Sequence, residues 1–272
     1  MATFPDWEGK VIFNRKFKPT SYQYGKEYQL RRANKYRNRH NSHWKFRVDL
    51  AHSLVNKYAL PRLVRKKIED IVIVDVEALE IAEQLCAEEN VFAEFVQADI
   101  SDWKQNFPPI DIAICFDIFE HLQDDELGSF LRATRKQLSK EGGLVFHTFP
   151  TQYDYIFFSG PYLRLPLVPF RNLSIPRFNR VVKAYASLVD IVYLFKNGST
   201  YKEAIKISRH CNPTTSERLK DILERSGYDI VYMQSSQLYP FKKSVQEQFS
   251  KQPITHRNLY GVAVPSASKD LK

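Results

Sequence analysis

The chain has 272 residues, of which 43% are hydrophobic, 14% are aromatic and 26% are charged. This apolar content is enough for a substantial core, so a wholly disordered chain is excluded, and the length predicts one large domain or one domain with an appended region. The three cysteines, an odd number without metal-like spacing, argue against a secreted disulfide scaffold and against a zinc ribbon.

Targeting and membrane signals are weak in this sequence. The first ten residues contain no apolar segment followed by a cleavage site, so we expect no signal peptide. The longest apolar stretch, Val181–Phe195, contains Lys183 and Asp190 and is too short to span a bilayer. We therefore expect a soluble protein of the cytoplasm.

The net charge of +9 is concentrated near the N-terminus. Residues 1–67 hold 17 basic and 4 acidic side chains, whereas the rest of the chain holds 23 and 27. The basic residues of this region include Arg31, Arg32, Lys35, Arg37, Arg39, Lys45 and Arg47, interleaved with Tyr28, Tyr36 and Trp44. They suit the phosphates of nucleic acid or anionic lipid. A solvated helical cap is the alternative that we favour, because no nucleic-acid motif accompanies the charges.

From Asp70 onwards, apolar runs alternate with helical patterns, as is typical of an α/β sheet with crossover helices. Ile71–Val76 predicts a buried strand. The spacing of the apolar residues that follow predicts one helical face, formed by Ala78, Ile81, Ala82 and Leu85. Phe92–Ala98 predicts the next strand.

The following segment predicts a strand, a helix and a second strand. Ile110–Phe116 is an apolar run. We expect Asp124 or Asp125 to cap the helix, and Gly142-Gly143 to end it and turn into a strand over Leu144–Phe149.

The pattern breaks after Pro150. Residues 151–210 contain eleven Phe or Tyr and four prolines, with one amphipathic helix predicted near 178–196. Thr214 and Glu217 have capping-box spacing for a helix that Gly227 ends. Two closing strands are predicted after it, over Tyr228–Met233 and Leu259–Val264.

The most specific segment is Ile110–Pro150, with the sequence IDIAICFDIFEHLQDDELGSFLRATRKQLSKEGGLVFHTFP. Together with residues 70–109 and 210–265, it resembles the class I S-adenosylmethionine-dependent methyltransferases, particularly those that act on small molecules. It looks like that family's fourth strand, Glu-His turn, following helix, Gly-Gly turn and fifth strand. The resemblance implies a three-layer, Rossmann-like α/β fold. Its sheet would be mostly parallel with an antiparallel closing strand, and a helical N-terminal cap and an aromatic helical insert would be added.

This resemblance divides the chain into five parts. They are a basic helical cap (1–67), the cofactor-side half of the methyltransferase domain (68–150), an aromatic insert or lid (151–210), the C-terminal helix and closing strands of that domain (211–265), and a tail (266–272).

The cofactor loop of the family is missing from this sequence. In the family, a glycine-rich loop after the first strand lets the backbone approach the methionine and ribose parts of the cofactor. Here no glycine occurs between Gly25 and Gly128. Val74–Val76 looks like the end of the first strand, yet the residues that follow look like the helix after the second strand. We expect an absent loop–helix–strand segment of roughly 20–30 residues, about one crossover unit, and S-adenosylmethionine binding that is weakened or lost.

The resemblance assigns five residues to the cofactor: Asp75, Asp99, Ile100, Phe116 and Asp117. Asp75 stands for the first-strand acid or for the ribose acid but not both, unless it only caps the next helix. Asp99 matches the position that accepts a hydrogen bond from the adenine amine, with Ile100 on the ring. A turn or helix-start Asp is the alternative. Phe116 and Asp117 end the strand that borders the cofactor, where Phe116 equally suits the core.

Glu120 and His121 lie where the family places groups near the transferred methyl. Histidine is suited to remove a substrate proton, although one at a helix entrance is more often a capping or hydrogen-bonded residue. Weaker candidates for substrate contact are His147, Tyr153, Tyr155 and His210. None of these residues has metal-ligand spacing, so we expect no metal.

The predicted function is methyl transfer to a small, hydrophobic or aromatic molecule. Aromatic residues of 151–210 would form a lid for it, or they simply pack together in a helical subdomain. The helix near 178–196 also suits a lipid interface. Two alternatives are a methyltransferase-like module that binds without catalysis and a binder of nucleic acid or anionic lipid that uses the N-terminal cap. The sequence leaves the oligomeric state open.

Overall fold

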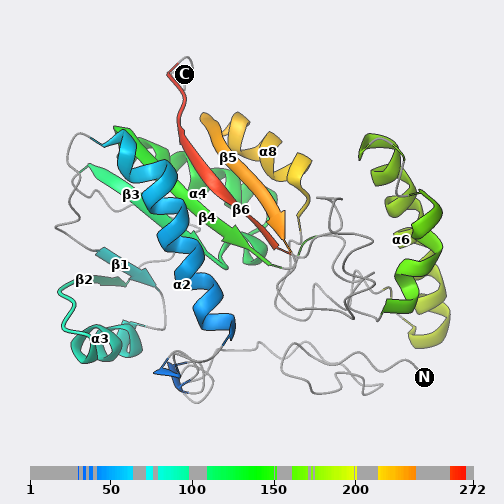
Figure 1. Cartoon of the computed structure of the whole chain (residues 1–272), viewed down its shortest axis with the longest axis horizontal. Helices are drawn as coiled ribbons and strands as arrows, with labels where there is room; N and C mark the ends of the chain where they lie inside the picture. Colours follow the sequence, from blue (N-terminus) through cyan, green and yellow to red (C-terminus); the bar gives the residue numbers. More distant parts are fainter. Residues whose placement is uncertain are drawn as a thin grey trace.

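A computed structural model of the chain shows helices packed on β-sheets (Figure 1). It describes residues 30, 33–34, 37–38, 42–63, 72–75, 79–97, 109–149, 151, 161–170, 173, 175–198, 200, 214–236 and 258–267. The elements in the first half are α2 (Ser42–Leu54), η1 (Val55–Ala59), η2 (Leu60–Arg62), β1 (Val72–Asp75), α3 (Leu79–Glu88), β2 (Glu94–Gln97), β3 (Ile110–Phe116), η4 (Phe119–His121) and α4 (Asp124–Gln137). Those in the second half are β4 (Leu138–Thr148), η5 (Pro161–Phe170), α6 (Ile175–Asn197), α8 (Ser216–Arg225), β5 (Tyr228–Ser236) and β6 (Asn258–Pro265).

The larger sheet has four strands in the order β3-β4-β6-β5. β3 and β4 are parallel, with Cys115 opposite Phe146, whereas β6 is antiparallel to both of its neighbours. Three strands therefore run in one direction and β6 closes the sheet against them. This arrangement confirms the predicted α/β fold with an antiparallel closing strand.

Helices cover both faces of this sheet, which gives three layers. Because side chains alternate along a strand, Leu144 and Phe146 face α4 and α8, whereas Val145 faces α2 and η1. Helix α2 crosses the front of the sheet in Figure 1. Leu54 and Val55 are buried there.

The smaller sheet consists of β1 and β2, which pair in parallel with Asp75 opposite Gln97. In doubly wound sheets of order 3-2-1-4-5, strands 2 and 3 are neighbours, as are strands 4 and 5, and strand 1 joins the two pairs. The pairs β1–β2 and β3–β4 match these outer pairs. Within the described residues, no strand joins them.

This pairing corrects the expectation that Val74–Val76 ends the first strand. A first strand would pair with β3, yet β1 pairs with β2 and so takes the place of the second strand. Among the residues that the structure describes, the unit without a counterpart is therefore the first strand with its loop and helix. Ile114 in the middle of β3 is 53% exposed, in agreement with the position of β3 at the edge of the larger sheet.

Two helix starts differ by one residue from the prediction. Gln123, not Asp124 or Asp125, is the N-cap of α4, and its N–H donates to Glu126 Oε2 at 2.7 Å. The two aspartates lie in the first turn, where their negative charges interact favourably with the positive end of the helix dipole. Similarly, Thr215 rather than Thr214 caps α8, because its Oγ1 accepts the Arg218 N–H at 3.2 Å.

The glycine pair does not end α4, as we expected. The helix stops at Gln137, and β4 begins directly at Leu138, which pairs with Ile110. Gly142 therefore lies inside the strand. A Cβ on Gly142 would approach the Ile110 carbonyl oxygen to 2.9 Å, so glycine is needed here for the close approach of β3 and β4.

The predicted helix near 178–196 is present as α6, which packs against η5. Across the part of the chain that the structure describes, no helix combines the length and the apolar character needed to cross a membrane.

Candidate functional site

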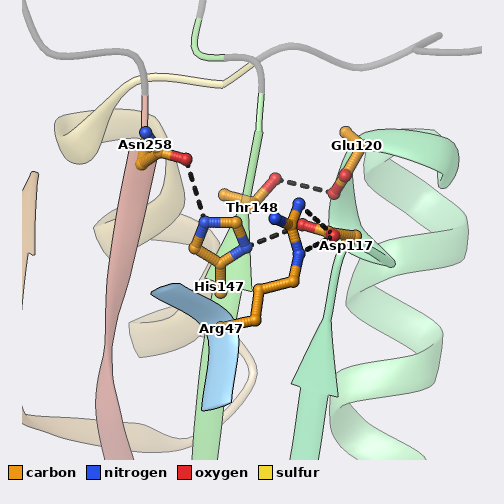
Figure 2. Close-up of polar contacts among 6 residues, drawn as sticks. All are labelled: Arg47, Asp117, Glu120, His147, Thr148 and Asn258. Atoms are coloured by element: carbon orange, nitrogen blue, oxygen red, sulfur yellow. Dashed lines mark hydrogen bonds and ion pairs between the residues drawn. The ribbon is translucent and has the colours of Figure 1, made fainter. Parts of the chain in front are cut away.

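Four polar side chains form a connected chain at the carboxyl ends of β3 and β4 (Figure 2). Arg47 on α2 donates from Nε to Asp117 Oδ2 at 2.6 Å, and its Nη2 lies 2.5 Å from the same oxygen. Asp117 Oδ1 lies 2.6 Å from His147 Nδ1. His147 Nε2 lies 3.0 Å from Asn258 Oδ1. The four residues come from a helix, the turn after β3 and the ends of β4 and β6.

Asp117 has an unusual backbone for a residue other than glycine. Its φ is +57°, in the left-handed region, and its N–H donates to the His147 carbonyl oxygen at 2.9 Å. Asp and Asn adopt this region more readily than other side chains do, and such strained positions occur often at functional sites. The turn thereby aims the Asp117 carboxylate back towards β4 and α2.

The environment of Asp117 stabilises its charged form. Burial alone would raise the pKa of this carboxyl, but the hydrogen bond and charge of His147, together with the Arg47 guanidinium, outweigh burial and hold the pKa well below its usual range. A carboxyl whose native pKa is depressed stabilises the fold above its unfolded pKa of about 3.9, and this contribution is lost as the pH falls towards the native value.

Glu120 has the opposite character. It lies on η4 with 1% of its surface exposed, and its Oε2 accepts the Thr148 Oγ1–H at 2.9 Å. Burial, followed by the negative charge of Asp117, raises the pKa of Glu120 well above its usual value. The surroundings of these two neighbouring carboxyls therefore act in opposite directions, favouring the ionised form of Asp117 and the neutral form of Glu120. Separation of this kind is typical of acid and base groups in active sites.

Replacing Glu120 with glutamine is expected to increase stability at pH 8 relative to the wild type. Because the native pKa is raised, the wild-type fold loses about 1.4 kcal/mol per pH unit as the pH rises from about 4.3 towards that pKa. Glutamine remains neutral and removes this loss. Urea unfolding of both proteins at pH 5 and pH 8 measures the effect. Glu94→Gln on an exposed part of β2 is the control, and an equal decline in wild type and Glu120→Gln would contradict the assignment.

Five of the predicted site residues have described side chains. The structure brings Asp117 and His147 into direct contact and places Glu120 against Thr148 beside them. The Phe116 ring lies 5.5 Å from the His147 ring, between centroids. His121 ends η4 and is half-buried. The roles that we assigned to these residues stay predictions.

His147 differs in environment from the substrate-contacting residue that we expected. It is completely buried, and both of its ring nitrogens lie within hydrogen-bond distance of side-chain oxygens. In this arrangement it holds Asp117 in position.

The remaining predicted residues lie wholly or partly outside the described residues. Only the backbone of Asp75 is described, at the end of β1. The residues that lie outside altogether are Asp99, Ile100, Tyr153, Tyr155 and His210.

Three partners in this site were not predicted: Arg47, Thr148 and Asn258. Arg47 belongs to the basic N-terminal region, but only 8% of it is exposed, and its charge pairs with Asp117. Arg47 is therefore buried and is not part of an exposed surface that could bind phosphates. Its Nη1 is buried and makes no hydrogen bond. As for metals, no cluster of three His, Cys, Asp or Glu suited to an ion occurs among the described residues.

The match to a family model decides which family this fold represents. The model described as "Methyltransferase domain" matches residues 58–233, more than half of the chain. The chain belongs to the methyltransferase-domain family. The resemblance to class I S-adenosylmethionine-dependent methyltransferases is thereby confirmed. No curated protein matches the sequence of this methyltransferase domain.

Solved structures with a similar fold are distant in sequence. One is an S-adenosylmethionine-dependent methyltransferase from Clostridium acetobutylicum, with 10% identity, a TM-score of 0.42, and 73% of this chain and 76% of that chain covered. The PH0226 protein from Pyrococcus horikoshii has 11% identity, a TM-score of 0.46, and coverage of 84% and 93%. A DhpI-SAM-HEP complex has 12% identity, a TM-score of 0.46, and coverage of 88% and 95%. The chain spans only 46% of PKMT2 from Rickettsia typhi.

Within the described residues, only the ribose end of the family's cofactor has a candidate partner at the matching strand position. Asp75 ends the strand that takes the second position, where the family has the acid that binds the ribose hydroxyls. For the methionine end, the described residues contain no strand between β1 and β3, and no glycine lies between Gly25 and Gly128 in the sequence. Any other side chain would hinder the close backbone approach that the glycine loop provides. The residues therefore do not fit the methionine end of the cofactor in the family's manner.

Proposed function

We propose that this chain transfers a methyl group from S-adenosylmethionine to a small hydrophobic or aromatic molecule, with a reduced affinity for the cofactor. The observation that supports the proposal is the pair of carboxyls, Asp117 and Glu120, at the carboxyl ends of β3 and β4. Ligands of doubly wound sheets bind at this edge. The cofactor supplies an activated methyl group when it is bound.

The chain's own residues would mainly align the acceptor and exclude water. Arg47 and His147 fix the orientation of the Asp117 carboxylate. Glu120 would remain a neutral hydrogen-bonding group near it. His121, which follows on the same turn, would remove a proton from the acceptor, because histidine is the side chain that most often acts as a general base.

A second candidate function is binding without catalysis, by a module that has kept the fold but lost the reaction. The division of the strands into two sheets, together with the missing glycine loop, favours this candidate. Such a module would still need the core between α2, the sheet and α4, and the buried Arg47–Asp117 pair. It requires no cofactor.

Calorimetry with S-adenosylmethionine and S-adenosylhomocysteine separates the two functions. Under the first proposal we expect saturable binding of both, and Asp75→Asn should weaken it by about tenfold through the loss of a charge-assisted hydrogen bond. Asp229→Asn, an exposed change on β5, is the control and should leave binding unchanged. If neither compound bound at millimolar concentration, methyl transfer would be excluded and the non-catalytic module would remain.

A further inference from the structure

Helix α6 has two apolar faces, and among the residues that the structure describes only one of these faces is buried. Phe178, Val182, Ala186 and Tyr193 are buried on the inner face. On the other side lies a second set of large apolar residues, which we name the apolar stripe: Leu188, Ile191, Val192 and Phe195. Their spacing of three and four residues places them on one side of the helix. They are 59%, 49%, 54% and 86% exposed.

Exposed apolar side chains are concentrated around this helix. Thirteen large hydrophobic residues are exposed in the described part of the chain, and eight of them lie between residues 165 and 195. Besides the apolar stripe, this group contains Leu194 on α6, Leu165 and Phe170 on η5, and Leu173 just after it. Since η5 contacts α6, the group gathers in one region of the molecule. Single exposed apolar residues are ordinary, but a concentration of this kind marks an interaction surface.

The charges of α6 indicate what binds there. Its charged residues are Arg177, Arg180, Lys183, Lys196 and Asp190. The four basic side chains are all exposed, whereas the single acidic one is half-buried. A second copy that presented the same face would bring these positive charges together, so self-association is disfavoured. An anionic surface complements them.

We propose that the apolar stripe of α6 inserts into the interface of a bilayer that contains anionic phospholipids. The stripe lies at the level of the acyl chains, and the basic residues in line with it or beside it, Arg177, Arg180 and Lys196, extend to the lipid phosphates. This helix lies in the plane of the membrane, in agreement with its inability to cross one. The proposal rests on α6 alone and does not depend on methyl transfer.

Co-sedimentation of the full chain with two kinds of vesicle tests the proposal. One kind is pure phosphatidylcholine, and the other also contains phosphatidylglycerol. We expect binding to the anionic vesicles, and Phe195→Asp should weaken it by about tenfold or more. Phe92→Asp is the matched control, because Phe92 is 94% exposed and lies outside α6. It should bind like the wild type, and thermal unfolding checks that both variants fold.

A second pair of variants tests the contribution of charge. Lys196→Gln should weaken binding to the anionic vesicles by about fivefold, whereas Lys136→Gln, an exposed change on α4, should not. Equal binding of the wild type and Phe195→Asp would overturn the proposal, as would absence of binding to the anionic vesicles. Dimerisation without lipid that Phe195→Asp abolishes would assign the apolar stripe to a second copy instead.

Discussion

Replacing Arg47 with alanine should destabilise the fold by about 3–5 kcal/mol. The guanidinium is buried between α2 and the sheet, and two of its nitrogens contact Asp117 Oδ2. Removing one partner of a buried ion pair leaves the other charge uncompensated, which costs more than the pair contributes. Urea unfolding at pH 7 measures the loss.

An exposed arginine provides the control for this change. Arg225 pairs with Asp221 four residues earlier on α8, and its side chain is 77% exposed. Because solvent screens such pairs, Arg225→Ala should cost no more than about 0.5 kcal/mol. Asp117→Asn tests the same buried pair from its other side, since asparagine tolerates the left-handed backbone and removes only the charge. If Arg47→Ala cost no more than Arg225→Ala, the guanidinium would not be a buried charge partner.

The strands of the Ile110–Pro150 segment were predictable because their apolar runs are continuous and bounded by turn residues. The first residues of β4 were not, since Leu138–Glu141 is mostly polar and follows a helical pattern without a break. Pairing with β3 outweighs that local pattern, and Leu138 is buried opposite Ile110. Tertiary pairing therefore decided where the helix ended.

The polar site was predictable only in part, because two of its residues are distant in sequence from the others. Asp117 and His147 lie at or next to strand ends, Glu120 lies on η4, and all three belong to the Ile110–Pro150 segment. Arg47 lies 70 residues before Asp117, and Asn258 lies 111 residues after His147. In the sequence, Arg47 is one of many basic residues, and nothing local indicates that α2 will bury it. Because buried charges are normally paired, a cationic partner for Asp117 could be expected, but the sequence does not indicate which basic residue it is.

The pairing of β1 in the smaller sheet indicates which position this strand takes in the fold. The absence of glycine after Val76 indicated a gap in the cofactor loop, and the open question was whether this strand is the first one, as its place before the gap predicted. Its pairing with β2 answers that question, because a strand in the first position would lie beside β3. Asp75 ends β1, and its role as a cofactor-binding acid stays a prediction.

Replacing Phe119 with alanine should cost about 3–5 kcal/mol, the range for large-to-small changes of a buried aromatic residue. Phe119 is 1% exposed and lies between two rings, with centroids 5.7 Å from Phe146 and 6.5 Å from Phe130. It also begins the turn that carries Glu120 and His121. Loss of the ring should therefore lower methyl transfer even at temperatures where the variant is folded.

Two further variants separate packing from a general effect of losing a phenylalanine. Phe119→Leu refills most of the volume and should cost less than about 1.5 kcal/mol. Phe92→Ala removes a ring that is 94% exposed and should change stability by no more than about 0.5 kcal/mol. Urea unfolding ranks the three variants. Should Phe119→Ala rank beside Phe92→Ala, the turn with Glu120 and His121 would have to be held by its hydrogen bonds rather than by this aromatic contact.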